Sequence, residues 1–591
     1  MSSSTARLRA SAVAGLLLSF VTAAAAARLV GPALLVDPDP AWALPRLALG
    51  LAFAACSAFG GALGVCSFYL FSGTGIVRGE LAAAPFPRAA MAVLAAAAIV
   101  AGTALRFTSL ATIPEPLWVD DASLVETTLA LRGRPGDFAD AIRPAPAGVA
   151  RPYGSVGVLY LEGYRLALRL AGTTVFGVRL PSALAGSASI VTAALLGRAF
   201  LPGGGSALAA LVLAGLRWSL VLSRWGWNMI ALAPISDAAC LLMLRARRRD
   251  SAGAALAAGA VAGAGAHVYL SAWIVAAGLL LLALWPGSQG ESVPPARRLR
   301  RAALLAAGFA LAAAPLFLLR ADRRGSYFAR TSDHSVLREI AREKSALPPV
   351  FAAADALAGP WALSDPSARN DLPGRRRLGW IVGVPAFVAF ARCLARPRED
   401  LSALLLSQAL AAAAATVAGG RADVPNGARF AYWTTLVALA AAAGTLALVG
   451  AAGGLRRRRA AALVAIGLLA IGGARSARDV LVTWPDRRET FDAFHGQDTL
   501  LGRAEARWAL RGPVSFDERL AHSPILVRTV ARWRLDPEPP PAPQPAPGRL
   551  RSYRIVAPQR ARALGRPVER IADAWGRTWG VVVAEPAKSA R

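Results

Sequence analysis

Hydrophobic residues along the chain come in long blocks, and short segments rich in charge, glycine or proline separate the blocks. Two examples are residues 90–105 and 403–420, whose lengths approach the roughly 20 residues that an α-helix needs to cross a bilayer. The pattern predicts an all-α polytopic membrane protein. We expect about 13 transmembrane helices, at residues 11–35, 45–72, 87–107, 179–200, 206–222, 227–244, 252–268, 271–286, 301–320, 378–395, 401–419, 428–452 and 460–474.

Arginine clusters separate several of these blocks, at residues 245–249, 297–301 and 456–459. Loops rich in arginine are typical of the cytoplasmic side of a membrane. Counting crossings from these loops places residues 108–152, 321–378 and 421–429, and the chain after about residue 475, on the opposite side. The net charge of +30 is therefore explained by loops that can contact anionic lipids. A protein that binds nucleic acid would carry its basic residues on one face. Here they are divided among separate loops, so the pattern does not indicate nucleic-acid binding.

One apolar segment, residues 155–172, carries Glu162, Arg165 and Arg169. Charges on a lipid-facing span are costly, so we interpret the segment as an amphipathic helix on the outer surface. This interpretation also gives the odd number of crossings that the loop at 108–152 and the cluster at 245–249 require.

The end of the chain lacks membrane signals. Residues 476–535 read as an extracytoplasmic extension and residues 536–549 as a proline-rich linker. Residues 550–591 read as a small α/β tail with a strand, a helix over 566–579 and a second strand. We expect the protein to fold without this tail. Residues 1–86 supply two additional N-terminal transmembrane helices, and residues 87–475 form the main membrane domain.

A pair of carboxylates, Asp120 and Asp121, lies directly after the block at 87–107. One of them can cap a helix that Gly133 ends, but capping does not account for both. The same loop adds Asp137, Asp140, Arg143 and Arg151. A carboxylate can take the proton of an incoming hydroxyl, and guanidinium groups can hold a departing phosphate, so this loop has the groups that transfer from a lipid phosphate needs.

Several motifs in order resemble bacterial glycosyltransferase family 39. This family belongs to the C-type membrane glycosyltransferases and is related to protein O-mannosyltransferases and the aminoarabinose transferases of lipid A. The resemblance covers about residues 87–535 and rests on "WVDDASL" (118–124), "VFGVRLPSAL" (175–184), "LSRWGWNMIALAP" (222–234), "GAGAHVYLSAW" (263–273), "SDPSARNDLPGRRRLGW" (364–380) and "VPNGARFAYW" (424–433). The chain departs from the family at Asp121, where Glu is common, at Asn426 and Gly427, where His is common, and at Ser364, where Gly is usual.

The resemblance implies an inverting transfer of sugar from a polyprenyl-phosphate donor, with Asp120 or Asp121 as the general base. The residues expected to bind substrate are Arg143, Arg151, Arg224, Asn228, Tyr269, Asp365, Arg369, Asn370 and Arg429. For some of them a structural role competes with this one. Arg224 can anchor a helix at the membrane boundary, Tyr269 can be an interfacial aromatic, and Asp365 with Asn370 can shape a loop.

The expected partners are a polyprenyl-phosphate sugar donor, an extracytoplasmic glycan, lipid or protein acceptor, and membrane lipids, with no nucleic acid. The expected location is the bacterial inner membrane, with the active site on the extracytoplasmic face. The four cysteines and four histidines show no metal-ligand spacing, so we predict no metal site and no cofactor, and a divalent metal stays open. A transporter or flippase of lipid-linked sugars, a glycan ligase or polymerase, and a non-catalytic family member are the alternatives.

Overall fold

The structure, a computed structural model, describes residues 85–130, 158–286, 293–318, 336–344, 349, 352–353, 361, 364–365, 367–419, 427–520, 522–533, 552–564 and 566–584. Several predicted features lie outside these residues. They are the two N-terminal helices, the side chains of Asp137, Asp140, Arg143 and Arg151, most of the loop at 321–378, and the proline-rich linker.

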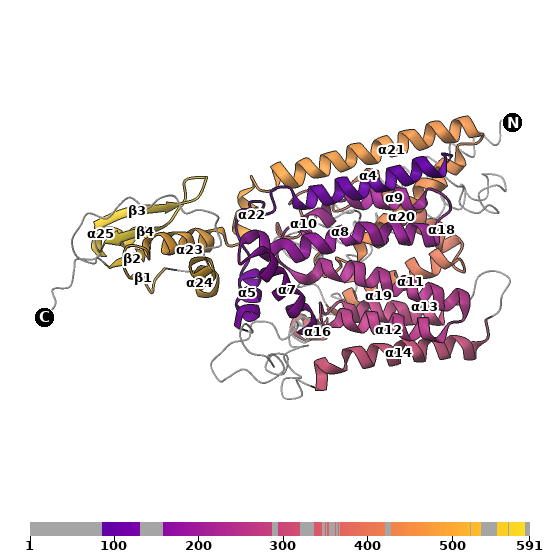
Figure 1. Cartoon of the computed structure of the whole chain (residues 1–591), viewed down its shortest axis with the longest axis horizontal. Coiled ribbons are helices and arrows are strands. Elements are labelled where there is room, and N and C mark those ends of the chain that lie inside the picture. Colours follow the sequence, from indigo (N-terminus) through magenta and orange to yellow (C-terminus); the bar gives the residue numbers. More distant parts are fainter. Residues whose placement is uncertain are drawn as a thin grey trace.

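The central part of the chain is a bundle of apolar helices that lie side by side (Figure 1), as expected for a multi-pass membrane protein. Seven helical segments in the described residues have the length and composition to cross a membrane. They contain α4 (Arg88–Phe107), α8 (Val175–Phe200), η1 (Asn228–Ala231) with α11 (Leu232–Arg249), α14 (Pro295–Leu318), α19 (Asp400–Gly419), α20 (Trp433–Ala451), and α21 (Leu455–Arg478) with η3 (Asp479–Thr483).

Four shorter apolar helices complete the described bundle: α9 (Gly205–Gly215), α12 (Ala252–Ala266), α13 (Ala272–Leu284) and α18 (Trp380–Ala395). Together with the seven longer segments they overlap every span predicted from 87–107 onward. A short helix, α16 (Val336–Glu343), lies between α14 and α18 in the chain. The predicted all-α membrane fold is therefore confirmed.

The arginine clusters meet at one end of the bundle, which we term the basic end. Arg248, at the end of α11, pairs with Asp400 at the start of α19 at 2.9 Å. Arg301 in α14 pairs with Asp250, which follows α11, at 3.2 Å. Arg247 donates hydrogen bonds to carbonyl oxygens at the end of α13. These contacts place the loops that carry the clusters on the same side of the bundle, as the alternation of crossings predicts.

The opposite end, termed the aspartate end, carries α5 (Val119–Ala130), α7 (Val158–Ala171), α10 (Arg217–Leu222) and the C-terminal domain (Figure 1). At 1.5 Å per residue, the 14 residues of α7 extend about 21 Å, which is short of a hydrocarbon core of about 30 Å. One face of α7 buries Tyr164 and Leu168. The three crossings from this end to residues 245–249 are then α8, α9 and α11, which agrees with the interpretation of 155–172 as a surface helix.

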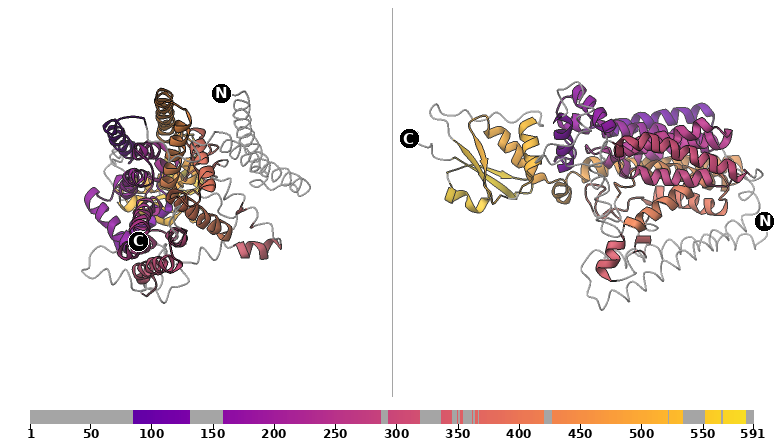
Figure 2. Two further views of the ribbon diagram at one scale, coloured as in Figure 1. Left: turned by 90° about the vertical axis from the view of Figure 1, so that its right-hand side faces the viewer. Right: turned by 90° about the horizontal axis from the view of Figure 1, so that it is seen from below.

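The C-terminal domain combines helices with a four-stranded sheet of order β1-β2-β4-β3 (Figure 2). Its helices are α22 (Arg488–Ala493), α23 (Gly496–Trp508), α24 (Pro524–Trp533), η4 (Pro558–Arg560) and α25 (Ala561–Leu564). β1 (Val514–Phe516) pairs in parallel with β2 (Tyr553–Val556), and β4 (Thr578–Ala584) pairs antiparallel with both β2 and β3 (Arg566–Ala572). The segments on either side of the proline-rich linker thus share one sheet.

The sheet packs against α23 and α24 through a cluster of buried apolar residues. Members of this cluster include Leu501, Trp508, Val527, Ile555 and Val582. Because strands from residues 550–591 cover helices from residues 476–535, the tail is part of a common core rather than an appended unit.

The helix predicted over residues 566–579 is wrong. This segment forms β3, a turn and the start of β4, with Ile571 buried against the helices and the backbone of β3 paired to β4. The turn is fixed by Asp573, whose carboxylate accepts hydrogen bonds from the backbone N–H groups of Trp575 and Arg577, and by Gly576 with φ of 80°. An Asp and a Gly three residues apart are a turn signal that outweighs the helical spacing of the apolar residues.

Two kinds of contact hold the membrane helices together. Glycines allow close approach of α12 and α14: a Cβ at Gly259 would lie 1.9 Å from the carbonyl oxygen of Leu305, so any side chain there would separate the helices. A buried acid ties three other helices, since Asp237 of α11 accepts hydrogen bonds from Thr192 of α8 and from Thr435 of α20, the latter at 2.6 Å.

Candidate active site

The two carboxylates of the first loop have different positions at the start of α5. Asp121 is the third residue of the helix, and its Oδ2 accepts a hydrogen bond from the backbone N–H of Trp118 at 3.3 Å. An acidic residue at this position that bonds to the residue before the helix is half of a capping box. Asp120 precedes it and is partly exposed. The capping role expected for one of the pair therefore falls to Asp121.

Asp121 is fully buried. Its surroundings are the Gly226 backbone, Arg179 of α8, and two tyrosines of α7, Tyr160 and Tyr164. Burial raises the pKa of the Asp121 carboxyl to about 7, and the charge of Arg179 opposes this rise. The same burial raises the pKa of both tyrosine hydroxyls, so they stay protonated. Asp121 is a group enclosed by protein, and water or a substrate hydroxyl reaches Asp120 more readily.

Two buried arginines hold the loop that leads into α5. Arg179 donates hydrogen bonds to the carbonyl oxygens of Leu110 and Pro116, at 2.9 and 2.8 Å. Arg224, which follows α10, donates to the carbonyl oxygen of Leu105 at 2.9 Å and also to that of Thr108. Neither side chain is exposed.

Arg224 was expected to bind substrate or to anchor a helix at the membrane boundary. In the structure its guanidinium is occupied by backbone carbonyls, and burial lowers its pKa to about 10. The geometry gives it a positioning role for the loop at 108–118. Arg179 has the same role, and although it stands in the quoted "VFGVRLPSAL", the sequence alone did not single it out.

Asp365 organises the loop between α16 and α18. Its carboxylate accepts hydrogen bonds from the Arg377 side chain at 2.9 Å and from the Gly427 backbone at 2.7 Å. It also accepts one from the Asn370 amide, at 3.3 Å. A Cβ at Gly427 would lie 2.9 Å from this carboxylate, so the absence of a side chain there permits the contact. Asp365 and Asn370 thus shape the loop, which is the structural role weighed against substrate binding.

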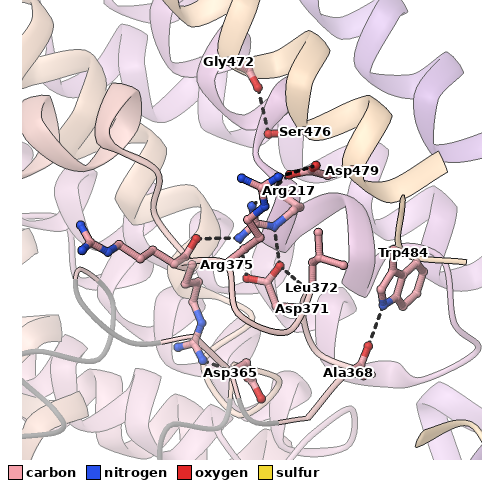
Figure 3. A network of polar contacts seen from close by, with 12 residues as sticks. Arg217, Asp365, Ala368, Asp371, Leu372, Arg375, Gly472, Ser476, Asp479 and Trp484 are labelled. Carbon is pink, nitrogen blue, oxygen red and sulfur yellow. Dashed lines mark hydrogen bonds and ion pairs between the residues drawn. The ribbon is translucent and has the colours of Figure 1, made fainter. Parts of the chain in front are cut away.

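The same loop is fastened to α10 and to the end of α21 by the ion-pair network in Figure 3. Arg217 Nε lies 2.6 Å from Asp371 Oδ1, and its Nη1 lies 3.4 Å from Asp479 Oδ2. Trp484 donates a hydrogen bond to the carbonyl oxygen of Ala368 at 2.6 Å. Of these residues only Ala368 and Asp371 fall in a quoted motif, and nothing in the sequence relates them to Arg217, Asp479 or Trp484.

Three segments of the aspartate end meet at Trp118, two residues before Asp120. The guanidinium carbon of Arg369 lies 3.6 Å from the centre of one Trp118 ring, and the His495 ring meets the indole edge-on with centroids 4.8 Å apart. Asp498 lies beside His495 at 3.3 Å. Arg369 was expected to bind substrate, and the structure places it over Trp118, two residues before Asp120. Trp118 and His495 were not among the expected site residues, because they are close only in the fold.

The C-terminal domain is docked on the same loop. Arg503 of α23 pairs with Glu115 at 2.6 Å, and Thr499 accepts a hydrogen bond from the backbone of Leu117 at 3.3 Å. Leu526 and Val530 of α24 belong to the buried cluster that contains residues of α5 and α7. The start of α5 is therefore enclosed by the membrane bundle on one side and by the C-terminal domain on the other.

The remaining expected residues lie near this region or apart from it. Asn228 donates a hydrogen bond to the carbonyl oxygen of Val268, and the adjacent Tyr269 packs against the cluster of α5 and α7. Arg429 is partly exposed just before α20. Arg143 and Arg151 lie outside the described residues. Among the residues that the structure does describe, no three His, Cys, Asp or Glu side chains gather as ligands for a metal ion.

Comparison with known proteins adds two findings. Residues 163–318 match the family described as dolichyl-phosphate-mannose-protein mannosyltransferase. The fold is similar to that of ArnT from Cupriavidus metallidurans bound to undecaprenyl phosphate, with a TM-score of 0.50, 14% identity, and coverage of 84% of this chain and 98% of ArnT.

An oligosaccharyltransferase, AglB from Archaeoglobus fulgidus in complex with an inhibitory peptide and a dolichol-phosphate, also resembles the chain, with a TM-score of 0.43 and 16% identity. That likeness covers 75% of this chain and 63% of AglB. No curated protein matches the chain by sequence.

Proposed function

The chain has the fold of the C-type membrane glycosyltransferases, as its motifs predict, and we propose that it transfers a sugar from a polyprenyl-phosphate donor to an acceptor outside the cytoplasm. The observation that carries this proposal is the start of α5, where a partly exposed Asp120 stands beside a buried Asp121 and follows Trp118, whose ring lies under the guanidinium of Arg369. The undecaprenyl phosphate bound to ArnT supports a donor of this lipid class.

Asp120 is the general base of the proposed reaction. Asp121 is committed to the cap of α5 and is enclosed by protein, so Asp120 is the carboxylate that an acceptor can reach. As the acceptor oxygen attacks the anomeric carbon, its proton passes to Asp120. The bond between that carbon and the phosphate oxygen breaks on the opposite face, which inverts the configuration and releases polyprenyl phosphate.

Arginine charge near the aspartates stabilises the phosphate that leaves. Arg369 is the first candidate, because its guanidinium lies over Trp118, two residues before Asp120. Arg429, Asn228, Tyr269, Arg143 and Arg151 are further candidates for binding the donor. Arg179 and Arg224 act through the loop at 108–118, which they hold in place.

The proposed function requires one orientation of the chain in the membrane. The basic end faces the cytoplasm, and the aspartate end and the C-terminal domain lie outside it, at the bacterial inner membrane. Residues 87–475 are then the membrane domain that carries the reaction, and residues 1–86 are two additional helices before it. The acceptor is an extracytoplasmic glycan, lipid or protein.

The test is a transfer assay with purified full-length protein in phospholipid vesicles. The donors are polyprenyl phosphates that carry single hexoses or pentoses, and mass spectrometry follows the release of polyprenyl phosphate. The acceptor is a cell-envelope extract from a strain that lacks the gene. We expect release from one donor and a new sugar in the extract. Movement of intact donors between leaflets without release would instead identify a flippase.

A further inference from the structure

The turn between β3 and β4 presents a tryptophan to solvent in a fixed orientation. Trp575 is 41% exposed, although its ring packs edge-on against Phe491 of α22 with centroids 5.5 Å apart. Asp573 fixes the turn by accepting hydrogen bonds from the backbone N–H groups on either side of Gly576. An exposed indole that is held in this way binds a ligand without losing conformational freedom.

Charged groups surround this indole and neutralise one another. Arg577 lies 2.7 Å from Asp492 and 2.5 Å from Asp573, both of them carboxylates, and its guanidinium carbon lies 4.7 Å from the centre of one Trp579 ring. The Trp579 indole N–H donates to Asp573 at 3.1 Å. The Asp492 side chain stays 45% exposed and Arg577 21% exposed. We term Phe491, Asp492, Trp575, Arg577 and Trp579 the Trp575 surface.

We propose that the Trp575 surface binds a neutral glycan, which is the acceptor of the transferase. That the glycan is the acceptor rests on the proposed function. That the surface binds a glycan rests on the geometry of the surface. A flat aromatic face packs against the C–H face of a pyranose, and a carboxylate and a guanidinium at its edge bond to ring hydroxyls. The same turn also holds Arg570, whose guanidinium donates to the carbonyl oxygen of Gly576. Because the carboxylates of Asp492 and Asp573 balance the charges of Arg577 and Arg570, the surface offers no excess positive charge to a phosphate or an anionic lipid headgroup.

The position of the surface supports an acceptor rather than an unrelated sugar. Phe491 and Asp492 belong to α22, and Phe494, directly after that helix, packs edge-on against Trp225 with centroids 5.9 Å apart. The neighbouring Gly226 faces Asp121. One short helix therefore connects the Trp575 surface to the start of α5, so a glycan held at Trp575 can extend toward Asp120.

Saturation-transfer NMR on full-length protein in nanodiscs of zwitterionic phospholipid tests the binding. The probes are linear trisaccharides of mannose, of glucose and of galactose. We expect saturation of ring C–H protons for at least one of them. Trp575→Ala should weaken binding of that probe at least about tenfold, the range of an aromatic hot spot, and Trp575→Phe should retain most of it.

Trp380 supplies a matched control. It is 48% exposed and lies beneath Arg376, whose guanidinium carbon is 4.5 Å from the centre of one Trp380 ring. Among the described residues, Arg376 is not flanked by two carboxylates as Arg577 is. Trp380→Ala should leave the binding unchanged. Thermal melting of each variant, with Trp575→Phe as the conservative change, separates loss of binding from loss of fold.

Three results would overturn the proposal: no binding of any trisaccharide to the wild type, equal binding by Trp575→Ala, or quenching of a fluorescent label at position 575 by lipids carrying a quencher in the headgroup region. The last result would assign the surface to the membrane. The binding measurement needs no donor and no turnover. A chain that binds the probe but transfers no sugar would therefore contradict the proposed function alone, and a chain that transfers sugar without binding the probe would contradict the glycan surface alone.

Discussion

Arg248 at the basic end and the pair Arg179 and Arg224 at the aspartate end have different partners. At the basic end, Arg248 is half exposed and pairs with the carboxylate of Asp400, and water can replace that contact. At the aspartate end, Arg179 and Arg224 are fully buried and bond to backbone carbonyls at the end of α4 and in the loop that follows it. A charged side chain that is buried against carbonyls loses its hydration, and it persists only where it fixes a conformation.

The difference separates residues that orient the chain in a membrane from residues that build a site. Arg248 acts by its charge, and many positions near the basic end serve equally well. Arg179 and Arg224 act by the geometry of a planar guanidinium that reaches two carbonyls at once, which lysine does not reproduce.

The largest expected effect is on catalysis. Asp120→Asn should reduce transfer about a hundredfold to ten-thousandfold, the usual contribution of a general base. Asp121→Asn keeps an acceptor for the Trp118 backbone and should lose less activity. Asp400→Asn, at the basic end, should leave the rate unchanged. The assay is release of polyprenyl phosphate by vesicle-reconstituted protein. Full activity in both aspartate-end variants and in their double variant would remove the first loop from the active site.

The second prediction concerns the buried arginines. Arg179→Lys leaves at least one of the carbonyls of Leu110 and Pro116 without a donor, at a cost of about 1–3 kcal/mol for each unsatisfied group. Arg248→Lys should change the free energy of unfolding by less than about 0.5 kcal/mol, because the ion pair between Arg248 and Asp400 lies at the surface. Thermal melting of both purified variants measures the difference, and equal melting temperatures would erase the contrast between the ends.

Removal of the tail is the third test, and here the structure predicts the opposite of the sequence analysis. A stop after Pro537 deletes β2, β3 and β4, which exposes Leu501, Trp508 and Val527. Since α23 also holds the loop before α5, the truncated protein should melt earlier and lose activity. A control stop after Ala584 keeps all four strands. A truncated chain that keeps wild-type melting and transfer would show that the membrane bundle alone fixes the site.

The smallest expected effect is a dependence of stability on pH. Asp121 has a pKa near 7 in the folded protein and 3.8 as its ordinary value, so between these values the folded chain retains a proton that the unfolded chain releases. Its contribution to stability is therefore full below about pH 4, is lost as pH rises to about 7, and is constant above. Asp121→Asn removes this dependence. Between pH 5 and 8, the wild-type melting temperature should fall a few degrees more than that of the variant, and parallel curves would contradict the burial of Asp121.

The sequence predicts the parts of this fold that depend on local pattern. Apolar blocks of helical length and the arginine clusters between them are visible without tertiary information, and so is the aspartate pair beside a span. The strands of the tail show the limit, because the apolar spacing of residues 566–579 fits a helix until β4 is present to pair with it.

The site itself depends on contacts between distant residues. Arg503 and Glu115 are 388 positions apart, and His495 reaches Trp118 across a similar separation. The chain has 66 basic residues against 36 acidic ones, so the presence of an arginine at a position says little about whether that arginine belongs to the site. Arg179 and Arg224 differ from the others only in burial and in partner, which the sequence does not display.

The acid that joins α8, α11 and α20 has a consequence for how the chain is made. Asp237 and Thr435 are separated by 198 positions, whereas Thr192 is already synthesised when Asp237 emerges. At about 5–20 residues per second, a ribosome needs about 10–40 s to reach Thr435. During that interval the nascent bundle holds a carboxyl group with one of its two threonine partners missing, and only the arrival of α20 completes it. Thr435 therefore reports on the arrival of α20 in the bundle, and a chain that stops before α20 lacks the second of these two donors to Asp237.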